Sequence, residues 1–190
     1  GLLHGIIKSA PNINSTSIKP STYASTIYNS KNKQIAKLVT SGSNRIEVSL
    51  DQVPEHLQWA FIDTEDARFY EHNGIDIQGI GRAAFIAVST MNPSEGASTL
   101  TQQVLKNNVF TSWTNETSFI SSLKRKIQEQ YLALQLEKVT DKKTILESYL
   151  NTINLGSNTL GVQAASLRYF NKDVSKITVS EAAVIASITQ

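Results

Sequence analysis

The strongest constraint on the fold is the helical spacing of apolar residues that runs through the chain after residue 50. From Ile77 to Val88, apolar side chains recur at intervals of three and four residues, as on one face of an α-helix, and Asp76 stands where the N-cap of that helix belongs. Pro54 suits the first turn of an earlier helix, which we expect to run through "TEDARFYEH" and end near Asn73-Gly74. The spacing therefore predicts a mainly α fold.

Further helices are predicted along the rest of the chain. One follows Ser98 as its N-cap, and the segment Thr111–Ser118 then forms a loop. The others are expected over residues 123–139, 142–151, 161–169 and from Ser180 onward.

The region before residue 50 differs, because it is rich in Ser, Thr, Asn and Lys. Two β-prone runs within Ser25–Val39 flank a turn at Ser30–Lys33, which predicts a small β-hairpin, and Arg45–Leu50 is expected to add a strand. We therefore expect residues 1–50 to form an N-terminal linker and β segment that follows a membrane anchor outside this chain. Residues 51–190 form the main domain.

Composition excludes several classes of protein. The chain has 190 residues, of which 40% are hydrophobic, enough for one domain with its own core. A formal charge of +2 is too mild to predict general nucleic-acid binding. The absence of cysteine excludes disulfides and thiolate metal sites, and no apolar run of about 18 residues could span a bilayer.

The stretch "SEGASTLTQQVLKN" (Ser94–Asn107) is unusually polar for a packing helix, since its hydroxyl and amide side chains are poorer helix formers than Ala, Leu or Glu. It predicts a polar ligand. The alternative is a helix that is merely well capped and soluble.

Charged residues supply further candidates. In the helix over 123–139, Arg125 and Glu129 continue a line of apolar residues, which indicates either an ion pair at the domain rim or the wall of a polar cleft. Glu65 lies beside the apolar stripe of its helix, so its carboxylate points either into the protein body or to solvent.

For two other features, a structural explanation is weighed against a functional one. His72 has no second metal-ligating residue at helical spacing, so a packed or capping role is favoured over a metal ligand. The run Lys124-Arg125-Lys126 is either a solvated face or a binding site for pyrophosphate.

Five sequence blocks then occur in an order and spacing that resemble the peptidoglycan glycosyltransferase (transglycosylase) domain of class A penicillin-binding proteins and their monofunctional relatives. The resemblance covers about Val53 to Gln190, and its blocks are "TEDARFYEHNGID", "GASTLTQQVLKN", "RKIQEQYLALQLE", "KKTILESYLN" and "GVQAASLRYFNK...EAAVIAS". It implies a lysozyme-like, two-lobed helical fold, with the small β-hairpin region at its N-terminus.

The resemblance also implies a reaction. The enzyme would polymerise lipid II into glycan strands by inverting transfer of the growing glycan from undecaprenyl pyrophosphate to the GlcNAc 4-hydroxyl of lipid II. Glu65 would be the general base, and Glu129 would lie near the pyrophosphate as a second catalytic carboxylate. The residues implied to bind substrate and pyrophosphate are Ser98, Thr99, Gln102, Gln103, Lys106, Lys124 and Arg125.

Cofactor, partners and location follow from the same resemblance. At most a weakly bound Mg²⁺ or Mn²⁺ is expected, bridging Glu129 and pyrophosphate. The partners would be lipid II, the growing glycan strand, the bacterial cytoplasmic membrane and phosphoglycolipid inhibitors of the moenomycin type, with no nucleic acid. The domain would act on the outer face of that membrane, with Phe85, Ile86 and Val88 dipping into the bilayer.

The chain departs from the family pattern at three places: the long segment 107–122, Ser121 in place of a basic residue, and Asn154 in place of an aromatic. Two other functions stay open. One is a lytic, lysozyme-like enzyme in which Glu65 acts as an acid, although the basic residues then have no phosphate to bind. The other is a catalytically silent docking domain.

Overall fold

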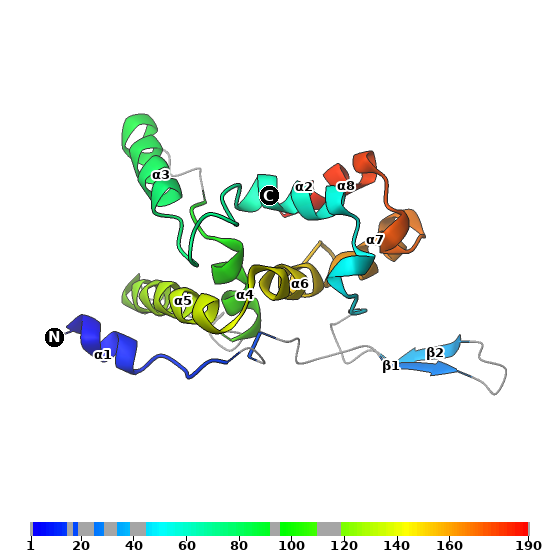
Figure 1. Ribbon diagram of the computed structural model, residues 1–190, viewed down its shortest axis with the longest axis horizontal. Coiled ribbons are helices and arrows are strands. Elements are labelled where there is room, and N and C mark those ends of the chain that lie inside the picture. Colours follow the sequence, from blue (N-terminus) through cyan, green and yellow to red (C-terminus); the bar gives the residue numbers. More distant parts are fainter. Residues whose placement is uncertain are drawn as a thin grey trace. The chain divides into compact units, whose positions relative to one another are not determined.

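The computed structural model describes residues 2–14, 17–18, 25–28, 34–38, 45–91, 96–109 and 119–189 (Figure 1). These residues are mainly helical, as predicted. The elements in chain order are α1 (Leu2–Lys8), β1 (Ser25–Tyr28), β2 (Gln34–Leu38), η1 (Leu50–Gln52), α2 (Glu55–Glu65), α3 (Ile77–Thr90), α4 (Leu100–Asn108), α5 (Phe119–Val139), α6 (Lys142–Thr152), α7 (Val162–Phe170), η3 (Val174–Lys176) and α8 (Val179–Ser187). Within the described ranges, no helix combines the length and the apolar character needed to cross a bilayer.

The two strands β1 and β2 pair antiparallel, with Ser25 opposite Leu38 and Ile27 opposite Ala36. The register shifts between Ile27 and Tyr28. The turn expected at Ser30–Lys33 lies outside the described residues, as does the loop expected at Thr111–Ser118.

The prediction of a strand at Arg45–Leu50 is wrong. Residues 45–49 belong to no strand, and Leu50 begins the short 3₁₀ helix η1. The side chain of Asn151 on α6 takes the place of a partner strand: its Oδ1 accepts from the Val48 N–H at 2.9 Å, and its Nδ2 donates to the Val48 carbonyl at 2.8 Å. Both backbone groups of Val48 are thus satisfied without a β-ladder.

The chain divides into two compact units, one formed by residues 1–18 and 65–145 and the other by residues 19–64 and 146–190. The core of the second unit holds Leu57, Phe61 and Tyr149, none of which is exposed. The rings of Phe61 and Tyr149 meet edge to face, with centroids 5.7 Å apart, a favourable aromatic geometry.

The first unit contains α4 packed against α5. Their apolar faces are fully or almost fully buried, and the residues concerned are Leu100, Val104 and Leu105 on α4 and Leu132, Ala133 and Leu136 on α5. Gly74 sits close to α5, because a Cβ on it would lie 2.6 Å from the carbonyl oxygen of Ala133. Its φ of +97° also suits glycine.

Several helix boundaries differ from the prediction, and the N-cap of α3 agrees with it. α2 ends at Glu65 instead of Asn73-Gly74, because Asp66 turns inward to accept a hydrogen bond from the Leu100 N–H at 2.9 Å. The N-cap of α4 is Thr99, one residue after the predicted Ser98. α5 begins at Phe119 instead of residue 123. Asp76 is the N-cap of α3, as predicted, and accepts from the Gly79 N–H.

The apolar stripe of α3 faces outward. Ile77, Phe85 and Val88 are 79%, 74% and 82% exposed, although the stripe is spaced as if to pack. Such a run of exposed apolar side chains is typical of an interaction surface.

Candidate active site

The carboxylate of Glu65 lies at the C-terminal end of α2 and is half-buried. Gln103, on α4, donates from its Nε2 to Glu65 Oε2 at 2.9 Å. This hydrogen bond fixes the direction of the carboxylate while part of it stays accessible. Glu65 is therefore a carboxylate that is held by α4 and not fully buried.

A second polar cluster joins α5 to the residue before the α4 N-cap. The Lys126 ammonium donates to Glu129 Oε1 at 2.7 Å and to Ser98 Oγ at 2.6 Å. The Glu129 side chain is only 4% exposed, whereas that of Lys126 is 42% exposed. A buried carboxylate is thus paired with a cation that reaches solvent.

The first turn of α4 is closed by a capping box. Thr99 accepts from the Gln102 N–H, and Gln102 Oε1 accepts from the Thr99 N–H at 2.9 Å. Thr99 also donates to the Gly74 carbonyl at 2.8 Å. Thr99 and Gln102 are buried, so these two predicted ligand-binding side chains hold the helix start in place.

Asp66 and His72 form a buried pair beside this turn. His72 Nε2 lies 2.9 Å from Asp66 Oδ1, and the other ring nitrogen accepts from the Gly74 N–H at 3.1 Å. Because Nδ1 is an acceptor, Nε2 carries the proton that is donated to Asp66. The packed role expected for His72 is confirmed.

The basic run on α5 is divided between two faces of the helix. Lys124 lines an almost wholly apolar groove together with Gly5 and Ile6 of α1 and Leu123 of α5. Lys126 lies two residues on, about 200° round the helix at roughly 100° per residue, and faces Ser98. Arg125 is half-buried between them, and Lys106 is exposed in the last turn of α4. The structure thus places Lys124 away from the cluster of Ser98 and Glu129.

Comparison with known proteins decides the family. A family model described as Transglycosylase matches residues 31–190. The chain belongs to this family. It is 43% identical over 194 residues to penicillin-binding protein 1A of Clostridium novyi, covering all of this chain and 22% of that protein.

Two further relatives are as similar. Penicillin-binding protein 1A/1B of Bacillus subtilis is 40% identical over 186 residues, covering 97% of this chain and 19% of its own length. Penicillin-binding protein 1A of Escherichia coli is 46% identical over 165 residues, covering 85% of this chain and 18% of its own length. The chain thus spans less than a quarter of the length of these relatives.

Lys126 belongs to the basic run considered for pyrophosphate, but it is missing from the site residues that the family resemblance implied. The signal was available, because Lys126 and Glu129 are three residues apart and such pairs face each other on a helix. What the spacing could not give is the contact with Ser98, which comes from a distant part of the sequence.

The candidate site contains few side chains that could bind a divalent cation. Within the part of the chain that the structure describes, no three His, Asp or Glu side chains gather closely enough to hold a metal. Glu129 supplies one carboxylate, and one of its oxygens already accepts from Lys126. A single carboxylate suits only a cation that keeps most of its waters and is shared with a phosphate ligand.

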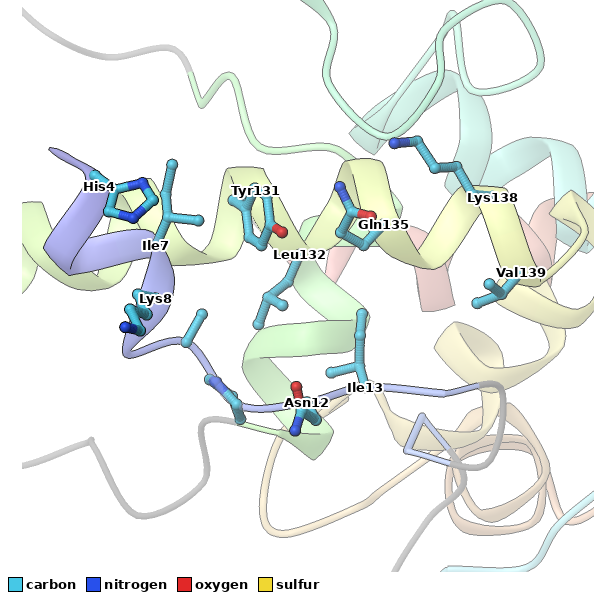
Figure 2. Close-up of a pocket in the computed structure, with 12 residues that line it drawn as sticks. His4, Ile7, Lys8, Asn12, Ile13, Tyr131, Leu132, Gln135, Lys138 and Val139 are labelled. Atoms are coloured by element: carbon cyan, nitrogen blue, oxygen red, sulfur yellow. The ribbon is translucent and has the colours of Figure 1, made fainter.

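A groove of about 620 Å³ lies between α1, residues 10–13 and α5, on the side of α5 that faces α1 (Figure 2). Figure 2 shows Tyr131, Leu132 and Gln135 along one wall and Ile13 along the other. None of the site residues predicted from the sequence lines it. The polar clusters around Glu65 and Glu129 therefore remain the candidate active site.

Proposed function

We propose that this transglycosylase polymerises lipid II into peptidoglycan glycan strands. The observation that carries the proposal is the position of α4. Gln103 on this helix binds Glu65, and Ser98, next to its N-cap, binds the Lys126–Glu129 pair. One short helix thus connects an accessible carboxylate with a buried, cation-paired carboxylate, which are the two environments that the reaction needs.

The proposed chemistry begins with the GlcNAc 4-hydroxyl of lipid II, which is a weak nucleophile. Glu65 accepts the proton of this hydroxyl as its oxygen attacks the anomeric carbon of the growing glycan. The bond from that carbon to the undecaprenyl pyrophosphate breaks, the pyrophosphate leaves with the electron pair, and the anomeric centre inverts. Cations stabilise the leaving charge, so no general acid is required.

The residues that bind the pyrophosphate are proposed from their placement. Arg125, Lys106 and Lys124 are the predicted cations, and Arg125 is able to bind two phosphate oxygens at once. Lys126 adds a third charge beside Ser98. Because Lys124 lines the groove beside α1, we assign it no part of this contact.

A divalent cation has at most an auxiliary place in the proposal. Glu129 would hold Mg²⁺ or Mn²⁺ weakly, together with the pyrophosphate, and the bound ion would neutralise leaving-group charge. Turnover that survives complete chelation would show that the cation is dispensable.

The family also suggests an architecture and a location. We propose a lysozyme-like, two-lobed fold with the small N-terminal hairpin, acting on the outer face of the bacterial cytoplasmic membrane and anchored by a transmembrane segment outside this chain. The exposed stripe of α3 would contact the bilayer through Phe85 and Val88. Phosphoglycolipids of the moenomycin type would compete for the site.

Labelled lipid II with sizing of the products tests the proposal. Glu65→Gln keeps the size of the side chain and a partner for Gln103 but removes the base, so polymerisation should fall by roughly 10²–10⁴-fold with donor binding little changed. Arg125→Ala should weaken donor binding as well, by about 1.5–3 kcal/mol. Glu71→Gln, which alters an exposed glutamate nearby, is the control for Glu65.

The products separate the alternatives. Long glycan strands support the polymerase, whereas short fragments released from preformed glycan would identify a lytic enzyme, and no product at all a docking domain. Near-normal polymerisation by folded Glu65→Gln would make Glu129 the leading candidate for the base.

A further inference from the structure

Helix α6 begins with two lysines, Lys142 and Lys143, at the end where the helix dipole disfavours a positive charge. Lys143 is exposed, as expected for a cation in that position. The Lys142 side chain is only 21% exposed and points into the protein. A cation held inward at the unfavourable end of a helix must have specific partners elsewhere.

The Lys142 ammonium has polar partners on two segments of the chain. It lies 2.8 Å and 2.7 Å from the two carboxylate oxygens of Glu137 and donates to the His72 carbonyl at 2.7 Å. It also lies 4.5 Å from the ring centroid of Phe69, within the range of a cation–π contact. The Glu137 side chain is 6% exposed, so this is a buried ion pair.

Two of these partners, Glu137 and His72, are hydrogen-bonded to segments that contact or adjoin Glu65. Glu137 also accepts from Thr101 Oγ1 at 2.6 Å, which ties the pair to the first turn of α4, the helix that carries Gln103. His72 binds Asp66, the residue directly after Glu65, and Asp66 accepts from the Leu100 N–H. Lys142 therefore connects the two segments whose spacing sets the contact between Gln103 and Glu65.

We infer that Lys142 is a positioning residue for Glu65. The inference rests on the proposed function, in which Glu65 is the base. Lys142 holds the segment 66–74 against α4 through His72 on one side and Glu137 on the other. Without the ammonium, the Glu65 carboxylate loses its fixed direction, while Lys106, Arg125 and Lys126 keep their places for donor binding.

The design of the test separates positioning from stability. Removing Lys142 alone leaves Glu137 buried without its cation, and such a change is strongly destabilising by itself. Replacing both partners by apolar residues removes the unpaired charge and is often neutral for stability. The double variant Glu137→Met/Lys142→Met should therefore recover the melting temperature, but it cannot recover the link from the His72 carbonyl through Lys142 and Glu137 to Thr101 on α4.

The experiment measures melting temperature, kcat and KM for lipid II in the full chain. We expect Lys142→Met to lower both the melting temperature and kcat. The double variant should melt within about 3 °C of the parent, which corresponds to roughly 1 kcal/mol for a chain of this size. Its kcat should still be at least about tenfold lower than that of the parent, and its KM should lie within about twofold of the parent's value. Lys143→Met, the matched control at the next position, should change none of these quantities.

A double variant with the kcat of the parent would overturn the inference, as would one in which KM rises and kcat does not fall. Failure of the proposed function looks different, since the parent would then make no glycan or Glu65→Gln would retain activity.

Discussion

Lys126→Met tests how much folding stability the chain loses when the buried Glu129 carboxylate has no cation beside it. The substitution keeps the length and the apolar stem of the side chain but removes the ammonium that binds Glu129 at 2.7 Å and Ser98 at 2.6 Å. The Glu129 side chain is 4% exposed, so water replaces the lost partner poorly. The variant thus leaves a buried charge uncompensated.

The magnitude follows from the exposure of the two partners. Breaking a fully buried ion pair from one side costs about 3–5 kcal/mol. Because the Lys126 side chain is 42% exposed, solvent already screens the pair, and we expect about 1–3 kcal/mol. At about 2–4 °C per kcal/mol for a chain of this size, the melting temperature should fall by roughly 2–12 °C.

Thermal unfolding followed by circular dichroism measures the effect, with Lys124→Met as the matched control on the same helix. Lys124 lines the apolar groove beside α1, so methionine there should change stability by no more than about 0.5 kcal/mol. Adding Glu129→Gln to Lys126→Met removes the unpaired charge and should restore part of the loss. Equal melting temperatures for Lys126→Met and Lys124→Met would refute the reasoning.

Two further predictions concern the segment between α2 and α3. Gly74→Ala should destabilise the chain by about 1–3 kcal/mol in urea titration, because φ is +97° and the new Cβ would lie 2.6 Å from the Ala133 carbonyl oxygen. The control is Gly81→Ala in α3, which should be neutral or stabilising because a Cβ there meets open space. Burial raises the pKa of Asp76, but its hydrogen bonds from Arg68 and the Gly79 N–H outweigh this and hold the pKa below the usual 3.8. The stability from Asp76 is therefore fully present above that value and is lost as pH falls through the lower folded-state pKa, so Asp76→Asn should show a flatter decline of urea midpoint with acidification than the parent. An unchanged acid slope would contradict this assignment.

The sequence predicted the helices after residue 50 because their apolar spacing reflects burial along each helix. It predicted their ends less well, because an end depends on partners that are distant in sequence. α2 stops at Glu65 since Asp66 binds the Leu100 N–H, and no local signal records that contact. The strand expected at Arg45–Leu50 failed for the same reason, because Asn151 satisfies the Val48 backbone.

The candidate site shows the same limit at the level of side chains. Lys124 and Lys126 look equivalent in the sequence, but they lie on opposite faces of α5. Lys124 lines the apolar groove formed with Gly5 and Ile6, whereas Lys126 binds Ser98. Only the position of α4 distinguishes them. Helical spacing did indicate that Arg125 and Glu129 continue a buried line, and Glu129 is indeed buried.

The polar stretch Ser94–Asn107 can now be divided by what its described side chains bind. Thr99 and Gln102 cap α4, and Thr101 binds Glu137, so these three side chains are buried and hold the fold. Ser98 and Gln103 instead bind two residues of the candidate site, Lys126 and Glu65, and remain partly exposed. Three of the hydroxyl and amide groups that suggested a ligand therefore stabilise the fold around the start of α4. The ligand contacts that we propose are made by the partly exposed side chains of Ser98 and Gln103, where a substrate hydroxyl or phosphate can compete for their hydrogen bonds.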